Sequence, residues 1–404
     1  MLIFKRIYCR VFQSAFRLAI PLLPYHKPEI IEGFQGLLPV LEEKNISSIL
    51  LVTDAGIRKA GLTAPLEKLL AENGVRCAVY DKTTANPTVP NVEEARELYL
   101  QEECQAIIAL GGGSSIDCAK ACGARIARPR KSLDKMKGLL KIHKKLPTLI
   151  AIPTTAGTGS ETTLAAVITD PKSHHKYPIN DFCLIPRYAL LDPQITCSLP
   201  PALTASTGMD ALTHAVEAYI GRSTTKQTRE DALEAVSLIF ENLRTAFHDG
   251  ADLEARKNML HAAYLAGSAF TVSYVGYVHA VAHSLGGRYG TPHGLANAVL
   301  LPYVLEAYGK AAHRKLLDLA VAAGLCDETA SPKEGAALFI QAIKDMKQEF
   351  GLKDSAIRVY GKDVPRLAYF AAQEANPLYP VPRLFSRREL EQFYRPFVKE
   401  VIDA

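Results

Sequence analysis

The chain has 404 residues, of which 48% are hydrophobic and 22% are charged, a composition typical of soluble globular proteins and not of disordered or fibrous ones. A chain of this length exceeds what one hydrophobic core usually supports, so two domains are expected. The formal net charge is +5, but four of the cations belong to residues 1–25, which contain no acidic residue: Lys5, Arg6, Arg10 and Arg17. The remaining body carries a net charge of only +1. It therefore offers no basic face to a nucleic acid, which we exclude as a partner.

Residues 1–25 are predicted to form a basic amphipathic helix or extension. Apolar residues recur along one face of this helix: Phe4, Ile7, Tyr8, Val11, Phe12, Phe16 and Ile20. Polar residues take the opposite face: Lys5, Arg6, Gln13 and Arg17. Three interpretations stay open: a packing or oligomerisation helix, a helix that lies on a membrane surface through residues 2–20, and a cleaved targeting segment. The last is the weakest, because Pro21 interrupts a short apolar run and no A-x-A cleavage pattern follows.

The eight cysteines are scattered, and no two of them form the C-x-x-C pair that is typical of thiolate metal sites and redox centres. Cys118 and Cys122 lie one helical turn apart, but two small side chains packed in a helix explain this spacing more simply than a shared metal. The cysteines indicate a reducing compartment, and no apolar run reaches the roughly 18 to 20 residues of a membrane-spanning helix. We therefore expect a cytoplasmic protein.

Between residues 26 and 200, short apolar runs alternate with amphipathic helical patterns. Five of the runs are predicted strands: Ser48–Thr53, Arg76–Tyr80, Ala106–Leu110, Thr148–Pro153 and Ala189–Asp192. Nearly continuous apolar strands that alternate with helices are typical of a parallel sheet with helices on both faces. Residues 26–200 are therefore predicted to form an α/β domain.

Beyond residue 200 the strand signal stops, and long helical patterns follow one another. They cover approximately residues 201–220, 228–248, 252–270, 333–350 and 387–401. Residues 201–404 are therefore predicted to form an all-helical domain. The Lys- and Arg-rich segment Arg128–Lys145 is interpreted as a solvated helix or loop, which explains it more simply than a binding patch.

A glycine-rich loop follows the predicted strand Ala106–Leu110. It reads GGGSS from Gly111 to Ser115, and a helical pattern begins near Ile116. Glycines let the backbone approach a pyrophosphate without an intervening Cβ, and a helix start supplies unpaired N–H groups and a positive dipole end. Tight turns use the same residues, so this loop alone is a weak signal for phosphate binding.

Two further features strengthen that signal. The strand Thr148–Pro153 runs into a second loop, Thr154–Ser160, whose hydroxyl groups and glycines suit hydrogen bonds to ribose and phosphate. Two such loops at strand ends indicate a dinucleotide site, since ligands of open α/β sheets bind at the carboxyl ends of the strands. Asp54 follows the first strand, where a carboxylate accepts hydrogen bonds from ribose hydroxyls and repels a 2′-phosphate, which favours NAD over NADP. A simple turn or cap residue is the alternative for Asp54.

Five metal-competent side chains gather in two short windows of the helical half. Asp210 and His214 are spaced i, i+4, as are His279 and His283, and His293 follows. This spacing places the two members of a pair on one helix face. One carboxylate with two or three imidazoles suits a divalent transition metal such as Fe²⁺ or Zn²⁺, whereas Mg²⁺ or Ca²⁺ calls for more oxygen ligands. Spacing indicates a metal site but does not decide which of the five residues bind the metal.

Together these motifs resemble the iron-containing alcohol dehydrogenases, and the resemblance runs from about residue 28 to the end of the chain. The matching motifs are Gly111–Ser114 with Asp117 and Lys120, PTTAGTGSE from Pro153, GMDALTHAVEAY from Gly208, GYVHAVAHSLGGRYGTPHG from Gly276, and Asn376-Pro377. The resemblance implies a dehydroquinate synthase-like architecture, in which an α/β dinucleotide-binding domain precedes an all-α metal-binding domain. It also implies a homodimer.

The resemblance further implies a role for each matching residue. The expected metal ligands are Asp210, His214, His279 and His293, while His283 is placed beside the nicotinamide as the catalytic candidate that moves a proton to solvent. The expected cofactor-binding residues are Asp54, Gly112, Gly113, Ser114, Asp117, Thr154, Thr155, Thr158, Val167 and Lys176. Four residues near the expected substrate space depart from the family pattern, so we expect an altered pocket: Thr271, Val272, Tyr274 and Ser284.

The reaction implied by the resemblance is a reversible hydride transfer between a small primary alcohol, diol or aldehyde and NAD(H), assisted by the metal. One alternative is a metal- and NAD-dependent lyase or cyclase on the same scaffold. Such enzymes handle acidic or phosphorylated substrates, yet Arg288 is the only Lys or Arg within the metal motifs. The other alternative, a catalytically silent nucleotide-binding scaffold, fits poorly with intact metal and cofactor motifs.

Overall fold

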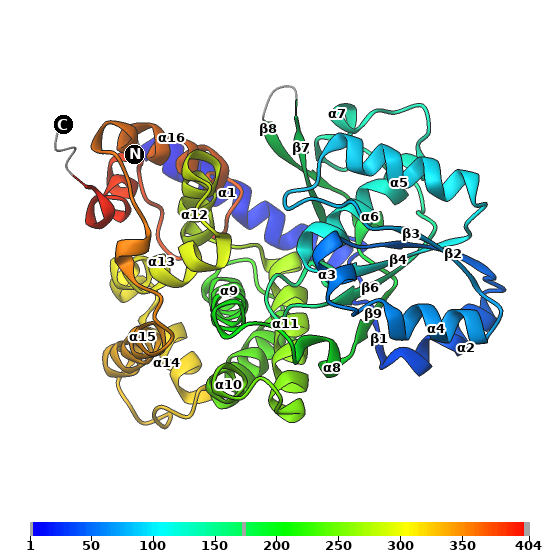
Figure 1. Ribbon diagram of the computed structural model, residues 1–404. Helices are drawn as coiled ribbons and strands as arrows, with labels where there is room; N and C mark the ends of the chain where they lie inside the picture. Colours follow the sequence, from blue (N-terminus) through cyan, green and yellow to red (C-terminus); the bar gives the residue numbers. More distant parts are fainter. Residues whose placement is uncertain (1–2, 172–174, 400–404) are drawn as a thin grey trace, which may run out of the picture. The chain divides into compact units, whose positions relative to one another are not determined.

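The computed structural model describes residues 3–171 and 175–399, and the chain divides into two compact units (Figure 1). The α/β unit is Pro24–Leu199, and the helical unit combines the N-terminal segment up to Leu23 with the chain from Pro200 onward. The N-terminal segment, expected as a separate extension of residues 1–25, therefore belongs with the helical unit.

A parallel six-stranded sheet forms the centre of the α/β unit, with the strand order β1-β9-β6-β4-β2-β3. The strands are β1 (Glu29–Glu32), β2 (Ser48–Val52), β3 (Arg76–Tyr80), β4 (Ala106–Gly111), β6 (Thr148–Pro153) and β9 (Tyr188–Leu191). All five predicted strands are present, each within one residue of its expected bounds. The edge strand β1 was not predicted, because only two of its four residues are apolar.

Helices cover both faces of this sheet (Figure 1). The helices of the α/β unit are α2 (Leu37–Glu43), α3 (Ala55–Lys59), α4 (Ala64–Glu72), α5 (Val89–Gln101), α6 (Gly113–Ala127), α7 (Leu133–Met136) and α8 (Pro193–Thr196). Side chains alternate across each strand, so Ile107 of β4 packs beneath α5 and α6 while Ile108 packs toward α2 and α4. Cys118 and Cys122 of α6 are buried in the first of these cores, and all eight cysteines, which lie in the described chain, are free thiols.

A small second sheet with the order β5-β8-β7 extends the α/β unit. Its strands are β5 (Gly138–Leu139), β7 (Ala165–Asp170) and β8 (His175–Asn180), and β7 pairs antiparallel with β8. The basic segment Arg128–Lys145 forms a loop that contains α7 and β5. This segment is not solvated throughout, because Leu133, Met136 and Ile142 are buried and anchor it to the core.

The helical unit confirms the all-α prediction for the C-terminal half. Its helices are α1 (Ile3–Ala19), α9 (Pro201–Ile220), α10 (Lys226–His248), α11 (Leu253–Ser273), α12 (Tyr277–Tyr289), α13 (His293–Tyr308), α14 (His313–Ala322), α15 (Pro332–Glu349), α16 (Val364–Ala375) and α17 (Arg387–Leu390). The helix expected at 387–401 is wrong, since α17 ends at Leu390 and only single 3₁₀ turns follow before the described chain ends. Pro396 lacks the N–H that a continuous helix would need there.

The central helix of this unit is α9, which packs against α10, α11 and α13. Every residue from Gly208 to Ile220 is buried, including the ionisable side chains of Asp210, His214 and Glu217. Buried ionisable groups are costly without partners, so this helix needs charged or hydrogen-bonding neighbours. Among the described residues no single helix is long and apolar enough to cross a bilayer. Helices α11 and α12 meet these two criteria only when taken together, and the pair is bent by 99°.

Candidate functional site

Three helices of the helical unit bring four metal-competent side chains together. Asp210 and His214 come from α9, His279 comes from α12, and His293 is the first residue of α13. Their ligand atoms all lie within 4.8 Å of one another. Two atoms bound to one tetrahedral Zn²⁺ ion are about 3.4 Å apart, so the four side chains would need to draw together by about 1 Å to hold a metal.

One buried ring nitrogen supports a metal-binding role for the cluster. Nε2 of His279 lies 3.9 Å from Oδ1 of Asp210 and has no hydrogen-bond partner among the described residues. Nδ1 of the same ring is 2.7 Å from Oε2 of Glu217. With its Nδ1 proton directed at Glu217, the ring presents the Nε2 lone pair to the cluster, as metal-binding histidines do.

The electrostatics of the cluster also favour a bound cation. Burial lowers the pKa of His279 well below its ordinary value, and the neighbouring histidines lower it further. The ring is therefore neutral, which is the form that binds metals. Burial raises the pKa of Asp210, against the opposing effects of His214 and of a hydrogen bond from Asn297. A divalent cation would stabilise the carboxylate that burial disfavours.

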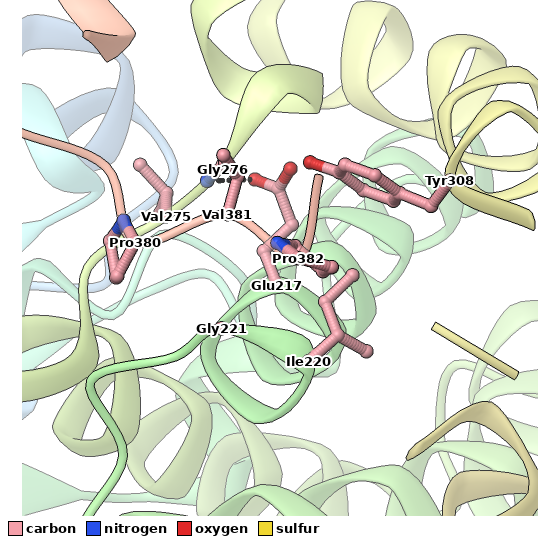
Figure 2. A pocket seen from close by; sticks show the side chains of 9 residues that line it. All are labelled: Glu217, Ile220, Gly221, Val275, Gly276, Tyr308, Pro380, Val381 and Pro382. Atoms are coloured by element: carbon pink, nitrogen blue, oxygen red, sulfur yellow. Dashed lines mark hydrogen bonds between the residues drawn. The ribbon is translucent and has the colours of Figure 1, made fainter. Parts of the chain in front are cut away.

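Glu217 joins α9 to the start of α12. Its carboxylate accepts the backbone N–H groups of Gly276 and Val278, both at 2.8 Å. Figure 2 shows Glu217 beside Gly276, with the hydroxyl of Tyr308 close by, lining a narrow crevice with Pro380–Pro382. A Cβ at position 276 would come within 2.6 Å of Oε1 of Glu217, so glycine is what allows this contact. None of the four metal-competent residues lines the crevice.

Sequence reasoning missed two polar residues that support the cluster. Glu217 lies within the quoted motif, three residues after His214, but no role was expected for it. Asn297 lies four residues after His293 on α13, and this i, i+4 spacing was the available signal. Its Nδ2 is 2.7 Å from Oδ1 of Asp210 and 3.0 Å from Nε2 of His293. Both residues hold metal-competent side chains in position.

His283 lies at the edge of the cluster and outside the group of four. Its ring stacks on His293, with the ring centroids 5.1 Å apart, and its side chain is 43% exposed. Nδ1 of His283 is 2.6 Å from Oε1 of Glu374, and the hydroxyl of Tyr379 donates to the same oxygen at 2.7 Å. Although burial raises the pKa of Glu374, His283 and Tyr379 together bring it below its ordinary value. No sequence pattern linked Glu374 to His283.

Two of the residues that depart from the family pattern contact segments near the two termini of the described chain. Ser284 donates to the backbone oxygen of Val281 at 2.7 Å and shares a 2.7 Å hydrogen bond with the hydroxyl of Tyr394. Tyr274 ends α11 with a φ of 63°, which is rare for a bulky side chain, and the edge of its ring meets Phe16 of α1 at a centroid distance of 5.2 Å. The predicted change in the substrate pocket stays a prediction.

In the α/β unit, the strand order creates a switch point between β2 and β4. From β2 the chain moves outward to β3 and then returns to the other side of β2. Ligands of doubly wound sheets bind at the carboxyl ends of the strands at such a point. Asp54 follows β2 and the glycine loop follows β4, and Ser115 Oγ donates to Oδ2 of Asp54 at 3.4 Å. The structure therefore brings the two sequence features to one edge of the sheet.

The start of α6 is open to a ligand. Gly112 is the N-cap of α6, and a Cβ there would meet nothing nearer than Oγ1 of Thr155, at 3.9 Å. That oxygen is buried and has no hydrogen-bond partner within the described chain. At Gly111, by contrast, a Cβ would lie 2.5 Å from Ser115 Oγ. A helix N-terminus beside an unsatisfied hydroxyl fits a phosphate group.

Three other expected cofactor residues lie near the carboxyl ends of the strands: Asp54, Thr154 and Thr158. Oδ1 of Asp54 caps α3 by accepting from Gly56 and Ile57 at 2.9 and 3.0 Å, so the cap interpretation holds for one of its two oxygens. Thr154 donates its N–H to the backbone oxygen of Gly111 at 3.1 Å, which ties the two loops together. Thr158 lies 3.4 Å from the position that a Cβ of Gly113 would occupy.

Four expected cofactor residues are engaged within the α/β unit. Oδ1 of Asp117 accepts from Ser160 Oγ at 2.8 Å, and Oδ2 accepts the N–H of Val167 at 3.0 Å. This carboxylate therefore joins α6 to the second loop and to β7. Ser114 Oγ accepts the N–H of Asn86 at 3.2 Å, and Lys176 donates to Oδ1 of Asn86 at 2.6 Å.

A doubly wound α/β unit together with a helical unit that carries a carboxylate–imidazole cluster is typical of enzymes that use a dinucleotide and a metal, among them metal-dependent dehydrogenases. Comparison with known proteins agrees with this class. The family model for iron-containing alcohol dehydrogenase matches residues 32–193, and the model for the C-terminal part of the Fe-containing alcohol dehydrogenase family matches residues 204–398. The chain belongs to the iron-containing alcohol dehydrogenase family and is an alcohol oxidoreductase.

Individual relatives resemble nearly the whole chain. The 1,3-propanediol dehydrogenase of Citrobacter freundii is 39% identical over 350 residues, which is 86% of this chain and 90% of the relative. A crystal structure of 1,3-propanediol oxidoreductase superposes with a TM-score of 0.88 at 35% identity, covering 92% of this chain and 98% of that one. The sulfoacetaldehyde reductase from Bifidobacterium kashiwanohense, in complex with NAD⁺, has a TM-score of 0.82 at 28% identity, with 92% and 98% coverage.

Proposed function

We propose that this chain is an NAD-dependent and metal-dependent dehydrogenase that interconverts a small primary alcohol or diol and the corresponding aldehyde. The observation that carries the proposal is the convergence of Asp210, His214, His279 and His293 within 4.8 Å. The relatives support the substrate class and the cofactor, since one is named a propanediol dehydrogenase and another is described with NAD⁺.

The donor set of one carboxylate and three imidazoles suits Fe²⁺ or Zn²⁺. When bound, such a metal supplies Lewis acidity toward an alcohol or carbonyl oxygen, and the nicotinamide takes or returns the hydride. The chain itself holds the donors in place. Glu217 fixes the ring of His279 through Nδ1, and Asn297 bridges Asp210 and His293.

His283 is the candidate for proton movement. It lies at the exposed edge of the cluster, with Nδ1 held by Glu374. A partly exposed imidazole that is oriented by a carboxylate is suited to pass a proton between a substrate hydroxyl and solvent. Loss of the imidazole should therefore slow turnover without removing the metal.

We assign the cofactor site to the carboxyl ends of β2 and β4 in the α/β unit. The start of α6 and Thr155 would hold the phosphates, and Asp54 would accept from the adenosine ribose and disfavour NADP. The expected homodimer and cytoplasmic location stay predictions drawn from the family resemblance and the cysteines. The dehydrogenase names of the relatives do not favour the lyase alternative.

The direct test is the rate of NADH loss at 340 nm with protein loaded with Fe²⁺ or Zn²⁺ and a panel of short and hydroxylated aldehydes. Steady turnover that EDTA abolishes is the expected result.

His279→Ala should lose bound metal and activity together. The control His261→Ala, which removes a partly exposed imidazole on α11, should keep both. His283→Ala should keep metal and NAD affinity but turn over slowly, and loss of its metal would remove the proton-transfer assignment.

Tight binding of metal and NADH without turnover on any aldehyde would contradict the proposed dehydrogenase. Product analysis without net NADH loss would then point to the lyase or cyclase. Activity that survives both EDTA treatment and His279→Ala would contradict the metal site.

A further inference from the structure

The N-terminal helix α1 contacts the rest of the helical unit through its polar face. Gln13 is buried and donates through Nε2 to the backbone oxygens of Pro377 and Tyr379, at 3.2 and 2.7 Å. Arg10 donates to the backbone oxygens of Val381 and Pro382, at 2.8 and 2.9 Å. Four hydrogen bonds thus fix how α1 is rotated about its own axis. Gln13, predicted to lie opposite the apolar face of the helix, does so and is buried there.

This rotation leaves the apolar face of α1 exposed. The apolar side chains of α1 that are more than half exposed are Ile3 (74%), Phe4 (85%), Ile7 (55%), Tyr8 (60%), Val11 (63%) and Leu18 (79%). At 100° per residue these side chains occupy one sector, opposite the buried Cys9, Gln13 and Ile20. Eight of the 18 large hydrophobic residues that are exposed in the described chain belong to residues 3–22. So dense an apolar surface marks an interaction site.

Cations border this apolar sector on both sides. The same helical spacing places Lys5 along one border and Arg6 and Arg17 along the other, and all three are exposed. Residues 1–25 contain no acidic side chain. An apolar stripe between two rows of cations is the pattern of helices that lie in the interface of an anionic membrane.

We propose that α1 binds this protein to the surface of an anionic lipid bilayer, with the apolar stripe of Ile3, Phe4, Ile7, Tyr8, Val11 and Leu18 inserted among the acyl chains. The three bordering cations lie at the level of the lipid phosphates. A second copy of the chain is a poorer occupant, because it would bring the same cations against this face without any carboxylate to pair with them. The family models match only from residue 32 onward, so this surface lies outside the matched catalytic domains. Leu2, included in the expected contact of residues 2–20, lies outside the described residues.

The test is flotation of the full chain with vesicles of phosphatidylcholine alone or mixed with phosphatidylglycerol. We expect the protein to float with the mixed vesicles at low salt and to bind them at least about tenfold more weakly at high salt. The variant Phe4→Ser/Ile7→Ser/Val11→Ser should abolish flotation. The variant Lys5→Gln/Arg6→Gln/Arg17→Gln should weaken binding about a hundredfold, since each cation near such a surface contributes about fivefold.

Matched controls carry equivalent changes elsewhere on the surface. Leu253→Ser/Leu338→Ser/Tyr369→Ser alters three exposed apolar side chains, and Lys68→Gln/Lys226→Gln/Arg314→Gln removes three exposed cations. Both controls should float like the unaltered protein. All variants should keep their dehydrogenase rates on water-soluble aldehydes, because none of these residues belongs to the metal cluster or the cofactor loops.

Two results would overturn the membrane proposal. One is a protein that floats with neither vesicle type or floats equally well after the stripe is altered. The other is an oligomer, measured by light scattering, that the stripe variant dissociates while no vesicle is bound. That second result would assign the stripe to a contact between copies of the chain.

Discussion

At the scale of single residues, the buried polar groups divide into those with partners within the chain and those without. Lys120 is fully buried, and its Nζ donates to the backbone oxygens of Thr163 and Ala165 at 2.8 and 2.9 Å. Nε2 of His279 and Oγ1 of Thr155 are buried without a hydrogen-bond partner among the described residues. Among the buried side-chain atoms of the described chain that have no hydrogen-bond partner, these two lie where the metal and the dinucleotide are proposed to bind.

Glu161 provides a pH-dependent prediction at this scale. Burial raises its pKa to about 7, against the opposing effects of a backbone hydrogen bond and Lys120. Because the folded pKa lies above the unfolded value of roughly 4.3, the ionised carboxylate destabilises the fold. This cost is absent at low pH, grows as the pH rises toward 7 and is constant above that. Glu161→Gln should therefore gain on the order of 3 kcal/mol over the unaltered chain at pH 8 and little at pH 4.5.

Urea unfolding at the two pH values measures this difference. Glu97→Gln on the exposed side of α5 is the control and should behave like the unaltered chain at both values. An equal effect of Glu161→Gln at pH 4.5 and pH 8 would show that Glu161 does not titrate in this range.

Asp54 provides a prediction about cofactor choice. If its carboxylate repels a 2′-phosphate, Asp54→Gly should raise the kcat/KM ratio of NADPH to NADH by at least about tenfold. Because Asp54 also caps α3, the glycine variant loses about 1 kcal/mol or less of helix stability. Asp54→Asn keeps a capping oxygen but removes the charge, so it should shift the ratio in the same direction. An unchanged ratio in both variants would remove the ribose assignment.

At the scale of elements, close packing between α9 and α13 determines where His293 lies. A Cβ at Gly294 would come within 2.4 Å of the backbone oxygen of Ser206, so glycine lets the start of α13 approach α9. Asn297, one turn further along α13, then reaches Asp210. The geometry of the metal cluster therefore depends on the absence of one side chain at a helix crossing.

Gly294→Ala should separate these helices and weaken metal binding by at least about tenfold, because a shift of even ~1 Å misplaces a metal ligand. Competition with a chromogenic chelator measures the affinity for Zn²⁺. Gly287→Ala is the matched control, since nothing lies within 4 Å of its Cβ position on α12. The control should keep its affinity and gain about 0.5–1 kcal/mol in stability. Equal metal affinity of the two variants would contradict the packing explanation.

At the scale of the whole molecule, the proposed metal cluster links three helices of the helical unit, whereas the proposed dinucleotide site lies in the α/β unit. A ligand that binds only the folded state stabilises it by about 4 kcal/mol at a thousand times its Kd. Saturating Zn²⁺ should therefore slow hydrogen exchange in α9, α12 and α13 much more than in β4, and EDTA should reverse the effect. His279→Ala should abolish it. Equal protection of both units in that variant would show that the metal binds elsewhere.

Much of this organisation follows from the sequence. The apolar runs Ala106–Leu110 and Thr148–Pro153 could be recognised as strands because a strand that is buried on both faces consists of consecutive apolar residues. Likewise, Asp210 and His214 share a helix face because of their i, i+4 spacing alone. The carboxyl ends of parallel strands meet at one edge of a sheet, so the position of Asp54 near the glycine loop also followed from the strand pattern.

Other features depended on contacts between residues that are far apart in the chain. Glu374 is 91 residues from His283, and Asn297 is 87 residues from Asp210. The amphipathic pattern of α1 predicted a helix but not the direction of its apolar face, which the hydrogen bonds of Gln13 to Pro377 and Tyr379 determine. Local patterns encode which residues share a face. The partner of that face is decided only when the chain folds, because burial and hydrogen bonding then depend on segments that no local pattern connects.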